Sequence, residues 1–415
     1  MSSATECGVD TPTGAAAALR STRAVRDRAR QLTARARAGD SPWFVVADDA
    51  LPDAAAAVAD VTRANYPELN IPFHSRWRHF ESGGVDRKAE LDRLLSHRDT
   101  AARARAMVDL TVVSVLLDAG AGAAWAYREP GTGKRFARSE GLGVASFHAF
   151  TGGLFSTDPD DPLRVDAAGL AGVSTQQLAE AFQVDGANPL VGLDGRVTLL
   201  HRLGHAMADA SDVFGPDGRP GGLFDTLCPP SGDSVRAHDI LSLVLTSLGG
   251  IWPSRSMIGD QSVGDCWQHP AVSGAGLTAG WVPFHKLSQW LTYSLLEPFG
   301  WAGVTVTDLD ELTGLPEYRN GGLFLDTGVL RLRDAEWRNQ SFRAADELVI
   351  EWRALTVCLL DELAPLVRSR LGVDAEQMPL ACVLEGGSWA AGRVLAQQLR
   401  DGLPPLTVFS DGTVF

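Results

Sequence analysis

Apolar side chains recur every three or four positions along most of the chain, which is the signature of amphipathic helices. In residues 346–371, for example, Val349, Leu355 and Leu359 fall close to one face with a period of 3.6 residues. The same spacing predicts helices over residues 22–38, 53–64, 86–95, 101–119, 175–182, 194–210, 235–248, 283–296, 308–312 and 346–371. The pattern therefore indicates a mainly α protein.

Strand signals are few and short. Residues 125–155 hold strand-like patches interrupted by glycines, which is typical of a small hairpin or a set of loops. Residues 252–281 are rich in Gly, Ser, Pro and Asp and predict a long loop, and residues 402–415 are expected to be extended or turn-like. Strands and helices do not alternate regularly, so the sequence does not predict a doubly wound parallel sheet.

The chain of 415 residues is long enough for two or three domain-sized units of about 150 residues. Residues 1–20 are small and polar and are predicted to form a disordered tail. Residues 21–415 are predicted to form a single mostly helical domain, built either as one body or as two lobes of residues 21–270 and 271–415. With 45% hydrophobic residues, this domain can bury a large core without a metal or a disulfide.

The formal net charge of −14 argues against a nucleic-acid partner, because an acidic chain repels a phosphate polymer. An anionic small molecule stays compatible with this charge, since local arginine clusters override the global sign. The five cysteines are scattered and never form a CxxC pair, which argues against a zinc site or a disulfide framework. No signal-peptide pattern opens the chain, and its most apolar stretch, residues 110–126, is shorter than a membrane span of about 20 residues. A cytoplasmic protein without a membrane partner is expected.

The common cofactor and metal motifs are missing from the sequence. No GxGxxG opens a helix after a strand, and residues 131–135 lack the Ser or Thr that ends a phosphate loop. His201 and His205 are four positions apart, but the Arg-Leu-Gly between them lacks the Glu of a zinc metalloprotease motif. We therefore expect neither a metal nor an organic cofactor.

Lysine occurs at only three positions, and one of them, Lys286, stands in the aromatic segment 281–293. On a helix, Lys286, Trp290 and Tyr293 share one stripe. A lysine among aromatic rings either extends its ammonium group to the surface or holds it in a pocket. Residue type alone favours the surface.

A second segment, residues 315–326, has Glu317, Tyr318 and Arg319 just before a pair of glycines. Paired glycines let the backbone turn tightly or approach a ligand. The polar residues before them are expected to project from a loop at the start of a helix. The alternative interpretation is an Arg–Glu surface pair that caps this helix.

A third segment, residues 72–81, combines two arginines and two histidines with aromatic rings. Arginine supplies bidentate contacts to phosphate, so Arg76 and Arg78 beside His74 form a candidate anion site. A basic surface loop explains the same residues equally well.

Several segments resemble one family along nearly the whole chain after the N-terminal tail. The matching stretches are PFHSRWRHFE, NPLVGLDGR, VPFHKLSQWLTYSL, LTGLPEYRNGGLFLDTGVL, EWRALTV and SDGTVF. They are similar to the signatures of the Urc-type uracil-catabolism proteins of fungi and bacteria. The resemblance implies a step of uracil breakdown in which ribosylurea, or its 5′-phosphate, is cleaved to urea and a ribose product.

The C-terminal half has a second, more distant resemblance to queuosine 5′-phosphate N-glycosylase proteins. The segments FHKLSQWL, DLDELTGLPEYR, DTGVL and EWRALTV follow the same order as in that family. Lys286 matches its lysine, whereas Glu317 stands where that family has an Asp, which is one methylene shorter. This resemblance implies a helical architecture related to helix-hairpin-helix DNA glycosylases, with minor β and loop elements, and cleavage of a ribosyl C–N bond.

Both resemblances imply an N-ribosyl hydrolase, and the residue chemistry is compatible with one. Hydrolysis of an N-riboside passes through an oxocarbenium-like state, which a carboxylate stabilises while it takes a proton from water. Glu317 is the candidate carboxylate, and Lys286 either assists the departing urea or fixes the carboxylate and the ribose. The candidate substrate-binding residues are His74, Arg76, Trp77, Arg78, Trp290, Tyr318, Arg319, Asp326 and Asp411.

Two other classes of function remain open from the sequence. One is a non-catalytic helical sensor or binding protein for a pyrimidine-breakdown metabolite. The other is an amidohydrolase acting on a urea C–N bond, although such enzymes need a metal or an activated nucleophile for which the sequence has no motif. The sequence does not determine the oligomeric state.

Overall fold

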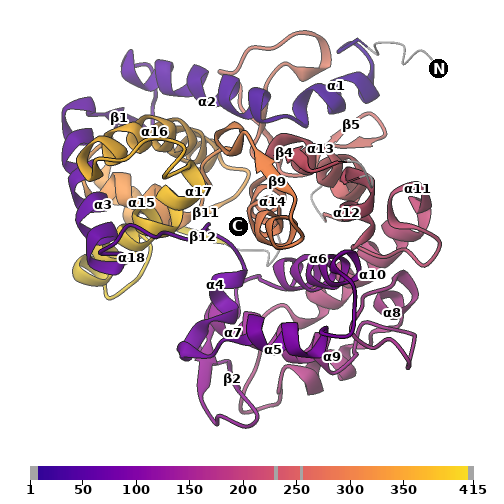
Figure 1. Cartoon of the computed structure of the whole chain (residues 1–415). Helices are drawn as coiled ribbons and strands as arrows, with labels where there is room; N and C mark the ends of the chain where they lie inside the picture. Colours follow the sequence, from indigo (N-terminus) through magenta and orange to yellow (C-terminus); the bar gives the residue numbers. More distant parts are fainter. Residues whose placement is uncertain (1–7, 229–231, 253–255, 410–415) are drawn as a thin grey trace.

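The computed structural model describes residues 8–228, 232–252 and 256–409, and helices dominate them, which confirms the mainly α fold (Figure 1). The helices are α1 Pro12–Leu19, α2 Thr22–Arg37, α3 Leu51–Asn65, α4 Trp77–Phe80, α5 Arg87–Leu94, α6 Thr100–Leu116, α7 Arg138–Thr151, α8 Ala167–Gly172, α9 Thr175–Ala181, α10 Leu193–Asp209, α11 Ser211–Phe214, α12 Gly222–Leu227, α13 Ala237–Leu248, α14 Lys286–Trp301, α15 Tyr318–Asp326, α16 Glu347–Leu371, α17 Leu380–Val383 and α18 Trp389–Arg400. A π-helical turn over Leu384–Ser388, here named the π-turn, joins α17 to α18. None of the helices in these described ranges is long and apolar enough to cross a membrane.

The strands are short and pair two by two throughout the described residues. The antiparallel pairs are β1 Phe44–Val46 with β10 Leu330–Leu332, β2 Ala126–Arg128 with β3 Arg135–Ala137, β5 Met257–Ile258 with β6 Gln261–Ser262, and β7 Cys266–Gln268 with β8 Trp281–Pro283. The parallel pairs are β4 Ser234–Arg236 with β9 Thr305–Thr307, and β11 Ser341–Arg343 with β12 Thr407–Phe409. These ladders fasten loops to the helical body and do not form a layer of their own.

Side-chain caps explain why several helices begin where the sequence predicts them. Ser21, Asp99 and Ser174 precede α2, α6 and α9, and each accepts a hydrogen bond from a backbone N–H of the first turn. The long helix α16 ends at Gly372, whose φ of 76° suits a residue without a Cβ.

Two differences between the helix boundaries and the sequence prediction have a clear local cause. Helix α14 begins at Lys286 instead of residue 283, because the preceding residues form β8 and His285 adopts a left-handed backbone with a φ of 52°. Residues 12–19, which were expected in the disordered tail, form α1, where Thr11 caps the helix and Pro12 occupies its first turn.

Two of the longer helices, α7 and α18, and several short ones are not among the helices predicted from apolar spacing. Most of α7 is buried from Gly141 to Phe150, so it has no polar face against which a stripe would stand out. In contrast, α18 is amphipathic but buries only the small residues Ala391, Gly392 and Ala396, and the sequence analysis missed it.

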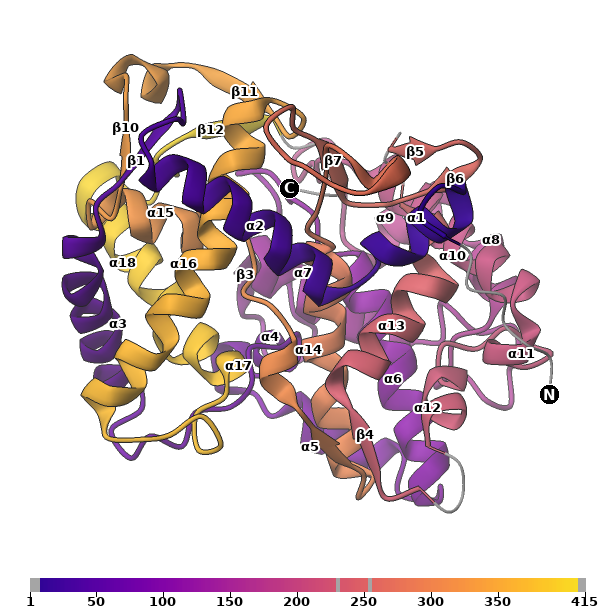
Figure 2. The same cartoon turned by 90° about the horizontal axis from the view of Figure 1, so that it is seen from above.

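Two groups of helices are visible in both views of the molecule (Figure 1, Figure 2). One group holds α3, α15, α16, α17 and α18, the other holds α6, α8, α10, α11, α12 and α13, and α14 lies between them. Helices α2 and α3 precede residue 270 in the chain, yet they pack against α16. Segments from both ends of the chain therefore build the first group.

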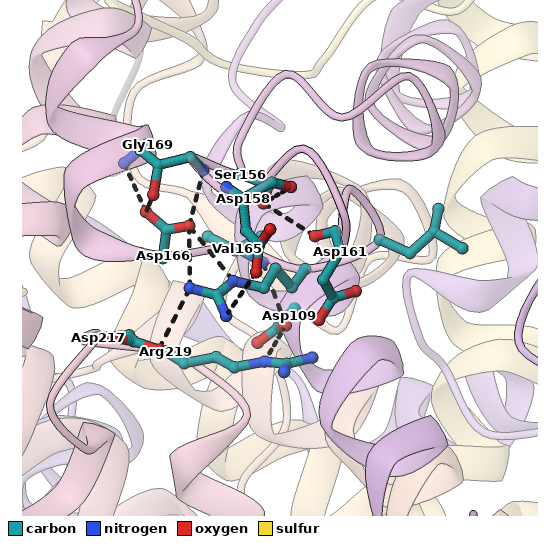
Figure 3. Close-up of polar contacts among 12 residues, drawn as sticks. Asp109, Ser156, Asp158, Asp161, Val165, Asp166, Gly169, Asp217 and Arg219 are labelled. Atoms are coloured by element: carbon teal, nitrogen blue, oxygen red, sulfur yellow. Dashed lines mark hydrogen bonds and ion pairs between the residues drawn. The ribbon is translucent and has the colours of Figure 1, made fainter. Parts of the chain in front are cut away.

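A polar network holds α6 to two loops of the second group (Figure 3). Asp109 of α6 is fully buried and accepts hydrogen bonds from the backbone N–H groups of Val165 at 3.2 Å and Gly221 at 2.7 Å. Its carboxylate also pairs with Arg219 at 2.6 Å. In the same network, the Asp166 carboxylate accepts from Gly169 N at 2.7 Å and caps α8. The network gives the buried Asp109 carboxylate three donors, as a structural support requires.

Candidate active site

A cavity of about 740 Å³ lies among the starts of α7, α14 and α15, the helix α18 and the loop that follows α6. Polar and charged side chains from six separate segments line it, together with the loop after α18. The lining residues used below are His74, Arg78, Asp118, Arg138, Lys286, Trp290, Glu317, Tyr318, Arg319, Glu385, Trp389 and Arg393. The cavity brings together most of the residues that the sequence singled out.

Four helices begin at the cavity. Arg138, Lys286, Tyr318 and Trp389 are the first residues of α7, α14, α15 and α18, and all four line the cavity wall. The N-terminus of a helix carries a partial positive charge that favours anions. The first backbone N–H groups of α14 and α15 already donate to the carboxylates of Asp265 and Glu317, and α18 continues directly from the π-turn. Positive charge for an anionic ligand therefore comes mainly from the arginines that line the cavity.

Glu317 is the N-cap of α15 and is half-buried at the cavity wall. One carboxylate oxygen accepts from Arg319 N at 2.8 Å, and the other accepts from Asn320 N at 2.5 Å. Burial raises the pKa of Glu317 above its usual value, although these two hydrogen bonds and the charge of Lys286 oppose the rise. Glu317 therefore caps α15 through backbone N–H groups rather than through a surface pair with Arg319, and the same residue lines the cavity.

Lys286 is the first residue of α14 and is half-buried. Burial lowers the pKa of its ammonium group to about 8, and the nearby charge of Arg353 adds to the effect. The carboxylates of Asp265 and Glu317 act in the opposite direction. Lys286 therefore loses a proton far more readily than a lysine in water.

A buried ion pair fixes the start of α14 from behind. Asp265 accepts two hydrogen bonds from the Arg353 guanidinium, at 2.8 and 2.7 Å, and a third from the backbone N–H of Lys286 at 3.0 Å. Although burial raises the pKa of Asp265, the charge of Arg353 outweighs it, and the pKa falls to about 2. The Arg353 guanidinium also lies 4.1 Å from the centre of the Phe284 ring. Asp265 and Arg353 thus hold Lys286 in place at the cavity edge.

The early aromatic and basic loop is divided between the cavity and the core. Arg78 lines the cavity and pairs with Glu297 at 2.6 Å. Arg76 is fully buried behind the wall and pairs with Asp118 at 3.1 Å. Trp77 is a core residue, and its indole N–H donates to Ser294 O at 3.1 Å.

Three of the remaining predicted binding residues line the cavity, one does not, and one lies outside the described residues. Tyr318 is 39% exposed, and the guanidinium of Arg319 lies 4.8 Å from the centre of its ring. Trp290 forms part of the opposite wall, on α14. Asp326 pairs with Arg400 at 2.6 Å and is not among the lining residues. Asp411 lies outside the described residues.

Three buried donors of cavity-lining residues lack hydrogen-bond partners within the described part of the chain. They are Nε of Arg78, Nε1 of Trp290 and Nε of Arg319. A buried N–H without an acceptor carries a desolvation cost of about 1–3 kcal/mol. A bound molecule with acceptor oxygens would satisfy such donors.

The sequence analysis missed Glu385 and the arginine and tryptophan of α18. Glu385 belongs to the π-turn and pairs with His74 at 2.8 Å. Arg393 lies 5.5 Å from the centre of the Trp389 ring, and both side chains line the cavity. The available signal was the pattern Glu-Gly-Gly inside a helical segment, because paired glycines mark a close approach of two backbones.

Metal-ligating side chains do not gather in the described residues: no group of three or more His, Cys, Asp or Glu side chains is placed to hold an ion.

The chain is similar to known proteins over almost its full length. The family model described as "Protein of unknown function (DUF1688)" matches residues 18–415. Protein urg3 of Schizosaccharomyces pombe is 39% identical over 411 residues, which cover 96% of this chain and 98% of that protein. Uracil catabolism protein 4 of Lachancea kluyveri is 39% identical over 378 residues, which cover 83% of this chain and 85% of that protein. The family match includes every segment that lines the cavity.

Proposed function

Because the chain belongs to the Urc-type uracil-catabolism family, whose model is described as a protein of unknown function (DUF1688), we propose that it acts in uracil catabolism as an N-ribosyl hydrolase. The substrate is ribosylurea or its 5′-phosphate, and the products are urea and ribose or ribose phosphate. One observation carries the proposal: Glu317 and Lys286 line the same cavity, and the charge of each shifts the pKa of the other.

Glu317 supplies the negative charge that the sugar needs. When the C1′–N bond breaks, positive charge develops on the ribose ring, as in glycoside hydrolysis. A fixed carboxylate beside C1′ stabilises that charge without reorganisation, because its two hydrogen bonds to the start of α15 already hold it in place. This role suits a carboxylate that is held at a helix N-terminus.

Lys286 supplies the proton for the leaving group. The electron pair of the broken bond goes to the urea nitrogen, which needs a proton to depart as neutral urea. An ammonium group with a pKa near 8 is still charged at neutral pH but gives up its proton more easily than an ordinary lysine. Solvent returns the proton to Lys286 after the products leave.

The arginines around the cavity suit a 5′-phosphate. Arg319 has a buried donor available for an acceptor oxygen, and Arg138 and Arg393 line the same cavity. Arginine binds phosphate through paired hydrogen bonds. Binding energy at a remote phosphate helps to orient the reacting bond. We therefore propose that the phosphorylated compound is the better substrate.

The test is to incubate the protein with ribosylurea and, separately, with its 5′-phosphate, and to follow the release of urea and of the sugar product. We expect wild type to release urea and Glu317→Gln to lose roughly 100-fold or more in rate. The amide keeps one acceptor for the cap, so we expect the free energy of unfolding to fall by no more than about 1 kcal/mol. The melting temperature should therefore change little. The control is Glu336→Gln, which changes an exposed carboxylate far from the cavity. Tight binding of either compound by wild type without any urea release would instead identify a sensor protein.

A further inference from the structure

A histidine and a glutamate that are 311 positions apart in the chain form a dyad at the cavity wall. His74 Nδ1 lies 2.8 Å from one oxygen of the Glu385 carboxylate, and the Tyr66 hydroxyl donates to the other oxygen at 3.4 Å. Both side chains are mostly buried, with 16% and 18% of their surface exposed. The backbone N–H of His74 donates to Ala381 O at 3.0 Å, so the loop itself is also fixed.

The π-turn explains how Glu385 reaches this position. Helix α3 packs directly on the turn, because a Cβ at Gly387 would lie 2.4 Å from Thr62 Oγ1 and 2.6 Å from Val58 O. On the other side, Ser388 Oγ donates to the side chain of Asn320 at 2.9 Å, in the first turn of α15. The turn is thus clamped between α3 and the helix that Glu317 caps. Single π-helical turns inside helices occur often at functional sites.

The pairing also selects the tautomer of the histidine. When His74 is neutral, Nδ1 carries the hydrogen that is donated to the Glu385 carboxylate, so Nε2 carries a lone pair. No side chain or backbone group in the described ranges hydrogen-bonds to this Nε2. His74, Glu385 and Glu317 all line the same cavity, so the dyad and the capping carboxylate belong to one site. An oriented imidazole with an available Nε2 is the arrangement of a general base.

We propose that His74, oriented by Glu385, takes the proton from the water molecule that attacks the ribosyl carbon. This inference rests on the proposed N-ribosyl hydrolase function and divides its work among three groups. Water forms the new C1′–O bond and gives one proton to His74 Nε2. The C1′–N bond breaks, and its electron pair and the Lys286 proton form the new N–H of urea. Glu317 stays ionised and stabilises the charge on the sugar, while Glu385 is a positioning residue.

Azide provides a test that separates the base from the other groups, because it is a nucleophile that needs no base. We expect His74→Ala to lower the rate of urea release roughly 100-fold or more, with KM little changed. Azide should restore urea release in His74→Ala and give ribosyl azide, identified by mass spectrometry. Azide should not restore Lys286→Met, because the departing urea still lacks its proton. The matched control is His148→Ala, since His148 pairs with Glu129 at 2.9 Å but does not line the cavity.

A double-mutant cycle tests Glu385 as the residue that orients the histidine. Glu385→Gln should lower the rate while leaving the melting temperature near that of wild type. If Glu385 acts through His74, the double variant should lose no more than His74→Ala alone, because the two residues act as a unit. Losses that multiply would show that Glu385 acts independently, which overturns its role as a positioning residue.

Three results would overturn the role of His74. Full activity of His74→Ala with an active wild type would refute only the dyad and leave the hydrolase proposal standing. A raised KM for the phosphorylated substrate with unchanged kcat would make His74 a phosphate ligand. No urea release by wild type from either compound would refute the hydrolase and the dyad together.

Discussion

Burial moves the pKa values of Glu317 and Lys286 toward each other. The carboxyl pKa rises because the charged form loses water, and the ammonium pKa falls for the same reason. Their mutual attraction opposes both shifts but does not cancel either. The half-buried position of this pair thus makes Lys286 an acid that can give up its proton near neutral pH. Solvent exposure would remove this property from both groups.

The pKa of Lys286 sets the alkaline limit of activity. As the pH rises through about 8, Lys286 loses its proton and can no longer protonate the leaving nitrogen, so kcat/KM should fall in this range. With a lysine of ordinary pKa, 10.5, the activity would stay constant to a much higher pH. Measurements of kcat/KM from pH 6 to 10 with the preferred substrate would show this decrease. A kcat/KM that stays constant to pH 9.5 would contradict the prediction. In Lys286→Arg, whose side chain stays charged, kcat/KM should not decrease near pH 8.

Single residues were predictable from sequence where local chemistry stood out. Lys286 is one of three lysines, and Glu317 stands just before a pair of glycines. The resemblance to the Urc-type family is confirmed, whereas the likeness to the queuosine 5′-phosphate N-glycosylases stays a prediction. The partners that position the site residues were not predictable, because they come from distant parts of the chain. Asp265 lies in an expected loop 88 positions before Arg353, and Glu385 lies 311 positions after His74. Contacts of such separation leave no periodic signal.

At the scale of elements, the site is built from helix starts. The sequence predicts most of the longer helices within a few residues, since their caps and apolar stripes are local properties. It does not predict α18, whose buried face consists of small residues that pack closely on α15. A Cβ at Gly392 would lie 2.2 Å from Arg319 O, so this helix pair depends on glycine. The likeness to helix-hairpin-helix glycosylases stays a prediction.

Because α3 packs closely on the π-turn, a methyl group added at Gly387 should lower the stability of the protein, whereas one added at an open glycine should not. Gly387→Ala should destabilise the protein by about 1–3 kcal/mol, because its Cβ would overlap atoms of α3 at fixed positions. Gly300→Ala is the matched control, since Gly300 lies in α14 and a Cβ there meets nothing within 4 Å. Alanine should be neutral there, or stabilising by up to about 1 kcal/mol. Urea unfolding of both variants measures the difference, and equal midpoints would refute the clamp.

At the scale of the whole molecule, the cavity depends on nearly the full chain. Its lining begins with His74 and ends with Val408, and both helix groups contribute. The N-terminal helices α2 and α3 complete the C-terminal group by packing on α16. A lobe boundary at residue 270 stays a prediction, and neither half would carry the site alone.

Two buried carboxylates predict the pH range in which the folded protein loses stability in acid. The pKa values of Asp265 and Glu129 fall to about 2 from ordinary values of 3.8 and 4.5, because arginine partners outweigh the effect of burial. A lowered folded-state pKa stabilises the protein above the ordinary value, and this stability is lost as the pH falls through the folded value. The melting temperature should therefore drop between about pH 4.5 and 2. The melting temperature of the double variant Asp265→Asn, Glu129→Gln should be lower than that of wild type at neutral pH and should fall less steeply as the pH is lowered. Parallel curves of melting temperature against pH for the two proteins would contradict this assignment.

The packing of α2 on α16 also governs the order in which the molecule can fold. Arg35 of α2 pairs with Glu351 of α16 at 3.0 Å, and the two residues are 316 positions apart. At a synthesis rate of about 5–20 residues per second, α2 leaves the ribosome roughly 15 to 60 seconds before its partner exists. During that interval α2, whose Val25 and Leu32 are buried in the finished protein, lacks the α16 surface on which it packs. Helix α2 is therefore a segment that chaperones would protect while the chain is being made.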